Sequence, residues 1–395
     1  DSQKVQEATQ FARKACKEAD TEPRQLYCSG INDFSKWCKV VNNSACTGDE
    51  GFYIPYVMAD DNQINFLKYI LNPSPSLGSG SMGRHLIDFF KAEFQKNPLL
   101  DAAWFDSLGA NWPARLNYRR DHFAKSRYPL TFDPNGRVAL HNKLAHYELV
   151  RAIREKFRPQ GKYVFANGLY AYRSRPHDFR PEPEHYLGSG DGVWLGRFFM
   201  SALLDFAGSE RGIKARPEDC QYVRAFMGKK QYSYLNYHWE DRKEVEDFLN
   251  RCLSFAIFGT NCHLHGVGRD KYYNNPEGDL RDKELLNWFV PKVRLLHRAG
   301  WEPVTYAHVN SSEVVIERYG SGNTVYFTVM LKEQTQPGKR QIVLDVESLG
   351  FKPDEFSVKE IARENAAKLI PPRTVEIELQ PVKTCVIAVR KTSAN

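Results

Sequence analysis

The sequence lacks several features that would assign it to a class at once. No apolar run reaches the roughly 18 residues that a membrane-spanning helix needs, so no membrane span is expected. No two cysteines have the C-x2–4-C spacing typical of zinc sites, and no Ser-x-x-Lys or Gly-x-Ser-x-Gly nucleophile stands at a strand–helix junction. The Gly-rich stretch Gly188–Gly192 is interpreted as a turn, because it lacks the strand and helix that flank a phosphate-binding loop. We therefore expect neither a metal nor a cofactor.

The sequence also lacks a concentrated basic patch. The net charge is +7, but the lysines and arginines are scattered, and the nearest cluster, Arg119-Arg120, is followed at once by Asp121. A nucleic-acid surface usually needs such a patch, so no nucleic-acid partner is expected. The positive net charge is compatible with an anionic carbohydrate as a ligand, and equally with an ordinary solvated surface.

Half of the eight cysteines lie close together near the N-terminus: Cys16, Cys28, Cys38 and Cys46. A dense, even-numbered cluster in a loop-rich stretch favours disulfide bonds in an oxidising compartment. Two Asn-x-Ser sequons, Asn42–Ser44 and Asn310–Ser312, are compatible with a glycosylated protein. We expect a secreted, extracellular or vesicular protein.

The region before residue 302 alternates between strand and helix patterns. Ala102–Gly109 reads as a short apolar strand that ends in Asp106, and a periodic helix over Leu140–Phe157 leads to the strand Tyr163–Gly168, which ends in Asn167. This order is typical of parallel βαβ units. Ala202–Glu210 and Gln231–Trp239 have the same pattern of a strand that ends in polar residues. A helix is predicted over Asp282–Ala299 and ends at Gly300, the residue type expected after a helix C-terminus.

Beyond Trp301 the apolar pattern changes to a period of two, which indicates short antiparallel strands. The expected strands are Val304–His308, Ser312–Arg318, Asn323–Met330, Gln341–Val346, Thr374–Leu379 and Thr384–Arg390. The predicted fold class is α/β: a (β/α)8-type barrel over residues 51–301, then an antiparallel β-sandwich over 302–395, with a Cys-rich segment over 1–50. No convincing first strand precedes residue 25, so the barrel is expected to be incomplete at its N-terminus, with an upstream fragment or another chain as a partner that completes it.

Two carboxylates follow strand patterns in this region, Asp106 and Glu210. Catalytic groups of (β/α) barrels stand at the carboxyl ends of strands, and hydrolysis of a glycosidic bond needs two carboxyl groups. The competing interpretation of Asp106 is a residue that begins the loop or caps the next turn. Glu184 and Asp191, near the Gly-rich turn, compete with Glu210 for the second carboxylate.

Aromatic and polar residues near the expected strand ends are candidates for sugar binding. Rings in these loops would stack on sugar faces, and the polar groups would bind hydroxyls or a charged substituent. The candidates are Trp112, Tyr118, Arg119, His122, Asn167, Tyr234, His238 and Trp239. For each one taken alone, a structural role is the competing interpretation.

Four segments carry a resemblance to a known class: Trp104–Gly109, Phe165–Gly168, Leu204–Glu210 and Ala299–Pro303. The chain resembles retaining glycoside hydrolases with a TIM-type barrel and a C-terminal β-sandwich, the broad α-amylase and α-galactosidase-like superfamily. The resemblance implies that Asp106 is the nucleophile, that Glu210 is the acid/base and that the substrate is an oligo- or polysaccharide. The alternative is an inactive carbohydrate-binding or structural protein on the same scaffold, because a fold does not fix a function.

Overall fold

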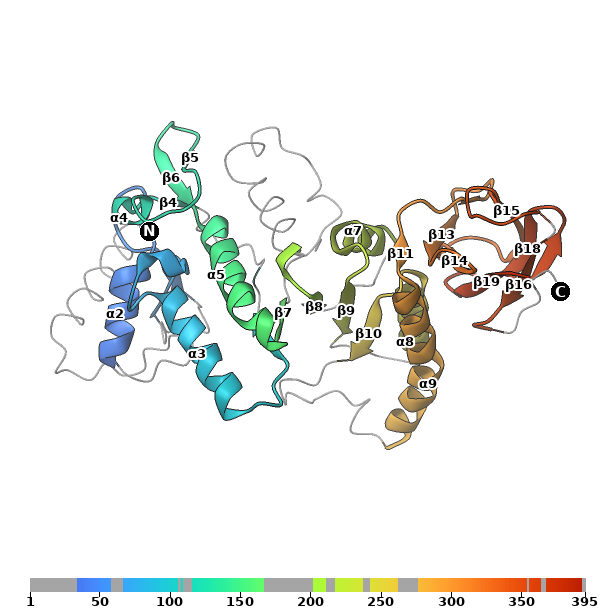
Figure 1. Cartoon of the computed structure of the whole chain (residues 1–395), viewed down its shortest axis with the longest axis horizontal. Coiled ribbons are helices and arrows are strands. Elements are labelled where there is room, and N and C mark those ends of the chain that lie inside the picture. The colour runs from blue at the N-terminus through green and yellow to red at the C-terminus, as the bar shows by residue number, and fades with distance from the viewer. Residues whose placement is uncertain are drawn as a thin grey trace. The chain divides into compact units, whose positions relative to one another are not determined.

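The computed structural model describes residues 34–57, 67–105, 108, 116–166, 202–210, 217–236, 242–261, 276–353, 355–363 and 367–392 (Figure 1). The chain divides into two compact units, residues 1–205 and 206–395. The predicted boundaries at residues 50 and 301 fall inside these units and stay predictions. The spacing of Val5, Phe11 and Cys16 predicts a helix over residues 3–19, which lies outside the described residues.

The helices of the first unit are α2 (Phe34–Ser44), α3 (Met82–Lys96), α4 (Arg120–Phe123) and α5 (Asn142–Phe157). Short 3₁₀ turns cover Pro75–Leu77 (η1) and Arg158–Gln160 (η2). The Ser81 hydroxyl caps α3 by accepting a hydrogen bond from the Arg84 amide. The helix predicted over Leu140–Phe157 is confirmed as α5. Leu149, Val150 and Ile153 recur at helical spacing and form its buried side.

Two parallel strands of the first unit confirm the predicted βαβ order. Strand β3 (Ala102–Phe105) pairs in parallel with β7 (Tyr163–Ala166), and α5 lies between them in sequence and packs on β7. Alternate side chains are buried in both strands, in the pattern of a sheet covered on one face: Ala103, Phe105, Val164 and Ala166.

The remaining strands of the first unit are short and antiparallel. They are β1 (Pro55–Val57) with β2 (Leu67–Tyr69), and β6 (Val138–His141) between β4 (Leu116–Asn117) and β5 (Thr131–Phe132). The sequence Gly51–Met58 predicts a strand that begins at Gly51. It begins instead at Pro55, because Gly51 has a φ of +81° and belongs to a turn.

The second unit begins with three parallel strands. Strand β9 (Gln231–Asn236) pairs with both β8 (Phe206–Glu210) and β10 (Phe258–Asn261), and these strands alternate with α7 (Pro217–Met227), α8 (Arg242–Ser254) and α9 (Pro276–Ala299). The sequence after Asp241 predicts a helix that continues towards Thr260. The helix ends at Ser254 instead, and Ala256 adopts a φ of +48° before β10 begins. Gly300 ends α9 as expected, with a φ of +85°.

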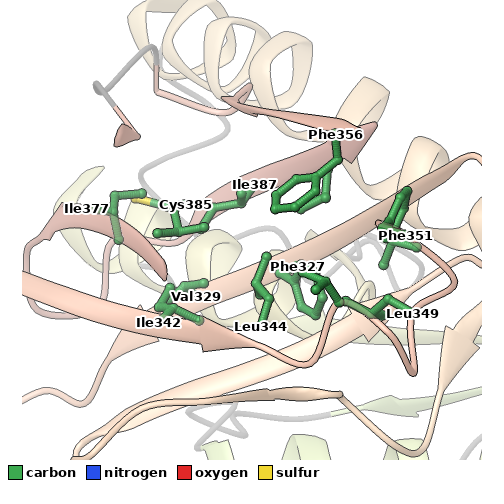
Figure 2. Close-up of a cluster of buried hydrophobic side chains, with 14 of the residues drawn as sticks. Phe327, Val329, Ile342, Leu344, Leu349, Phe351, Phe356, Ile377, Cys385 and Ile387 are labelled. Carbon is green, nitrogen blue, oxygen red and sulfur yellow. The ribbon is translucent and has the colours of Figure 1, made fainter. Parts of the chain in front are cut away.

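Two antiparallel sheets complete the second unit and confirm the predicted sandwich pattern. One sheet has the strand order β11 (Trp301–Glu302), β13 (Val314–Tyr319), β14 (Thr324–Leu331), β19 (Cys385–Lys391) and β16 (Phe356–Glu360). The other has the order β12 (Ala307–His308), β15 (Gly338–Leu344), β18 (Thr374–Leu379) and β17 (Lys368–Ile370). Their inner faces share one apolar cluster, in which Phe327 of β14 lies near Leu344 of β15 (Figure 2).

The sandwich and the preceding helices of the second unit are held together by buried polar contacts. Strand β14 is buried along nearly its whole length, because α8 and α9 pack on the face that the sandwich core does not cover. The Thr328 hydroxyl and the Tyr319 hydroxyl both donate to the Ser254 carbonyl at the end of α8, at 2.5 and 3.1 Å. Helix α8 is thereby fixed to the first sheet of the sandwich.

The architecture thus contains parallel strands alternating with helices and an antiparallel sandwich. Closure into a (β/α)8 barrel stays a prediction. None of the described helices is long and apolar enough to cross a membrane.

Candidate functional site

The carboxyl ends of the parallel strands are level within each unit. In the first unit the last residues of β3 and β7, Phe105 and Ala166, are register partners. In the sequence the next residues are Asp106 and Asn167, which lie outside the described residues. Parallel partners that end together direct their following residues to one edge of the sheet, where ligands of open and closed α/β sheets bind.

The second unit repeats this arrangement. Glu210 is the last residue of β8 and is paired with Leu235, while Asn236 at the end of β9 is paired with Asn261 at the end of β10. The candidate Tyr234 lies within β9, and His238, Trp239 and Trp112 fall outside the described residues. The backbone therefore places Glu210 at a strand terminus, as expected from the sequence.

An aromatic pair lies on the face of β3 and β7 that is opposite to the buried one. The rings of Trp104 and Phe165 stack with centroids 6.0 Å apart and planes inclined by 17°, and Trp104 is 37% exposed. Side chains two residues apart in a strand point to the same face. The pair was not identified from the sequence, although the Trp-x-Asp and Phe-x-Asn spacing would have given the signal.

Tyr118 and Arg119 connect the short strands of the first unit to α2. The Arg119 guanidinium donates to the carbonyls of Asn42 and Ala45 at 2.6 and 3.1 Å and forms an ion pair with Asp121 at 2.8 Å. The Tyr118 hydroxyl donates to Asp133 at 2.9 Å, and burial together with that carboxylate raises the pKa of Tyr118 to about 12. Both side chains thus have structural partners.

His122 is at the centre of a buried polar cluster and is 1% exposed. Its Nδ1 atom lies 2.9 Å from the Asn117 amide nitrogen and 3.3 Å from that of Asn72, and its Nε2 atom lies 2.9 Å from the Asn43 carbonyl. These partners fit a neutral ring that accepts at Nδ1 and donates at Nε2. Burial, reinforced by the charge of Arg119, lowers the pKa of His122 to about 4. Both ring nitrogens are engaged within the protein.

An open groove of about 470 Å³ borders two of the candidates. Its walls include Tyr118, Arg119 and the turn that contains Asp49 and Glu50. The aromatic faces next to it are partly covered, because the Arg137 guanidinium lies 5.4 Å from the centre of the Tyr118 ring. A role of Tyr118 and Arg119 in binding substrate stays a prediction.

The described part of the chain contains no group of three or more His, Cys, Asp or Glu side chains that could hold a metal ion. The described cysteines, Cys38, Cys46, Cys220, Cys252 and Cys385, are buried thiols. Burial raises the pKa of the Cys46 thiol well above its usual range. Cys16 and Cys28, the other two members of the N-terminal cluster, lie outside the described residues, so a disulfide in the N-terminal segment stays a prediction.

No protein-family model and no curated protein matches this chain. Solved structures of glycoside hydrolases and related enzymes are similar to it at low identity. A glycoside hydrolase family 30 endoxylanase from Clostridium papyrosolvens is 9% identical, with 91% of this chain and 85% of that chain covered and a TM-score of 0.39. A trehalulose synthase variant is 11% identical, with 96% and 86% covered and a TM-score of 0.44.

A family 30 xylanase from Clostridium acetobutylicum is 10% identical, with 78% of this chain and 70% of that chain covered and a TM-score of 0.38. These proteins are of the class that the sequence resembles.

Proposed function

We propose that the protein is a glycoside hydrolase that cleaves an oligo- or polysaccharide with retention of configuration. The observation that supports the proposal is that paired parallel strands end at the same level within each unit. Glu210 is the last residue of β8, and in the sequence Asp106 directly follows β3 and Asn167 directly follows β7. Parallel α/β sheets bind their ligands at these strand ends. The reaction needs two carboxyl groups, and in the sequence one directly follows β3 and one ends β8.

In the proposed reaction Asp106 attacks the anomeric carbon, and Glu210 donates a proton to the leaving oxygen as the glycosidic bond breaks. A water molecule then attacks the anomeric carbon of the covalent intermediate, Glu210 takes up its proton, and the Asp106 carboxylate is released. Retention requires the two carboxyl groups to lie about 5–5.5 Å apart. A crystal structure with both side chains in view measures this separation, and a distance beyond about 10 Å would contradict the assignment.

Aromatic side chains near the strand ends are proposed to stack on the sugar rings of the substrate. Trp104 and Phe165 form a stacked apolar floor two residues before the proposed nucleophile and Asn167. Trp112, Tyr234 and Trp239 are proposed as further stacking faces, and Asn167 and His238 as hydroxyl ligands. Because the net charge of the chain is positive, anionic sugars are included among the proposed substrates.

The proposal is tested by screening the full chain against a panel of neutral, uronic-acid and sulfated glycans, for binding and for hydrolysis. We expect hydrolysis of at least one glycan, and proton NMR of the fresh product should show the anomer of the substrate. Binding of a glycan without hydrolysis across the panel would instead identify a carbohydrate-binding protein. An inverted product would overturn the role of Asp106 as nucleophile.

The role of Glu210 has its own test. Glu210→Gln should slow hydrolysis most strongly for sugars with poor leaving groups, since an activated aryl leaving group needs little protonation. It should also remove the alkaline limb of the pH–rate profile, which reports the acid. The same slowing for both leaving groups would favour Glu184 or Asp191 as the acid/base, and these are the next substitutions to measure.

A further inference from the structure

The turn between β12 and β13 presents an Asn-Ser-Ser sequence to solvent. Asn310 is exposed in a bend, and Ser312 is exposed two residues later in the turn that leads into β13. The amide group of Asn310 and the hydroxyl of Ser312 make no hydrogen bond to any described residue. The turn is held by its neighbours instead, because the Glu313 amide donates to the Ser311 hydroxyl. Both groups that a glycosyl transfer needs are therefore accessible in the folded chain.

Open space lies beside this turn. A groove of about 360 Å³ is bordered by Ser311 and Ser312, and polar side chains from other elements complete its wall: Gln221, Thr305, His308 and Lys332. Hydroxyl, amide and amine groups of this kind can form hydrogen bonds with sugar hydroxyls. Hydrogen-bonding groups thus line a groove next to Ser311 and Ser312, in the turn that carries Asn310.

The other sequon, Asn42–Ser44, has the same residue pattern in a different setting. It forms the last turn of α2, and Ser44 is fully buried with its hydroxyl accepting from the Met82 amide at 2.8 Å. The Asn42 side chain accepts from the Tyr53 hydroxyl at 3.4 Å, and the Asn42 carbonyl accepts from Arg119 at 2.6 Å. An acceptor held in a helix, with its serine buried, cannot adopt the extended conformation of a surface loop.

We propose that Asn310 is an N-glycosylation site of the folded protein and that Asn42 is not. The donor is a lipid-pyrophosphate-linked oligosaccharide, and the transfer is catalysed by an oligosaccharyltransferase. The Asn310 Nδ2 atom forms a bond to the anomeric carbon of the first sugar, and the bond from that carbon to the pyrophosphate oxygen breaks. The lipid pyrophosphate leaves with the bonding electrons, and the amide loses one proton to the transferase.

The test is transfer in vitro onto the folded full chain by a purified oligosaccharyltransferase with its lipid-linked donor, followed by mass spectrometry of peptides. Synthetic peptides that contain each sequon provide the reference for acceptance without a fold. We expect both peptides to be modified, but only one glycan on the folded chain, at Asn310. That mass shift should be lost in Asn310→Gln and Ser312→Ala and kept in Asn42→Gln.

Two results would overturn the proposal. One is an unmodified Asn310 in the folded chain under conditions that modify its peptide. The other is modification of Asn42 in the folded chain to the same extent as Asn310. Circular dichroism of the variants before the reaction confirms that a lost mass shift is not a lost fold.

Discussion

The core of the sandwich and the polar cluster around His122 are both buried, but they are held together by opposite means. The sandwich core consists of apolar side chains from two sheets, such as Phe327, Ile342 and Val375. In the cluster, the side-chain amides of Asn72 and Asn117 each form a hydrogen bond with the His122 ring. The first kind of core depends on the apolar area removed from water, and the second depends on every donor keeping its acceptor.

The difference teaches which part of the chain responds to pH. Apolar side chains do not titrate, so the sandwich core should be indifferent to mild acid. The His122 ring must stay neutral, since a proton on Nδ1 would remove the acceptor of two amide groups and place a positive charge near Arg119. The cluster is therefore an acid-sensitive part of the described structure, and so is His146 of α5, whose pKa burial also lowers to about 4.

The largest expected effect is in the sandwich. Phe327→Ala removes a side chain that is 1% exposed at the centre of the core, and should lower the free energy of unfolding by about 3 to 5 kcal/mol. Urea denaturation at pH 7 and at pH 4.5 measures the loss, which should be equal at the two pH values. Val304→Ala, at a residue 51% exposed, is the matched control and should change stability by less than about 0.5 kcal/mol.

The next effect is the loss of stability in acid. The pKa of His122 is about 4 when folded against an ordinary value of 6.5, so the unfolded chain binds the proton between these values. The stabilisation is complete above pH 6.5 and is lost as the pH falls towards 4, by about 3 kcal/mol in total. The protection factors of the α2 and α4 amides, which are hydrogen-exchange rates corrected for the intrinsic effect of pH, should fall over this range.

His122→Gln sharpens the same comparison, since it removes the titrating group. We expect the variant to be less stable at neutral pH and to show a smaller acid-induced loss between pH 6.5 and 4. An unchanged loss would assign the acid sensitivity to other groups. Exchange of β14 and β18 amides in the same experiment reports the sandwich, which should not respond.

The smallest expected effect on stability comes from the contact between α8 and the first sheet of the sandwich. Thr328→Val keeps the shape of a fully buried side chain and removes its hydrogen bond to the Ser254 carbonyl. The carbonyl keeps its second donor, the Tyr319 hydroxyl. Stability should therefore fall by only about 1 kcal/mol, measured as a shift of the urea midpoint. A loss of stability as large as that of Phe327→Ala would show that this single hydrogen bond dominates the contact between α8 and the sandwich.

The sandwich was the more predictable region because its signal is local. Period-two alternation located β13, β14, β18 and β19 to within a residue or two, and the predicted Thr374–Leu379 is β18 itself. Strands β16 and β17 were missed, since they are only five and three residues long and contain two apolar residues each. A pattern with few apolar residues resembles a loop until its pairing partner is known.

The polar cluster could not be predicted, because its partners are far apart in the sequence. His122 contacts Asn72 and Asn43, which are 50 and 79 residues away, and Arg119 contacts Ala45, which is 74 residues away. Arg119 and His122 were identified from the sequence as polar residues in an aromatic loop, and their partners depend on tertiary contacts. For Asp106 and Glu210, the strand ends were predicted from local patterns, whereas the pairing of the two carboxylates stays a prediction.

The central claim is that the carboxyl end of β3 carries the nucleophile. It is tested most directly by comparing Asp106→Asn with Asp101→Asn, since Asp101 is an exposed carboxylate immediately before β3, at the opposite end of the same strand. On the glycan that the wild-type protein hydrolyses, kcat/KM should fall by several orders of magnitude for Asp106→Asn and stay unchanged for Asp101→Asn. Equal activity of the two variants would contradict the account.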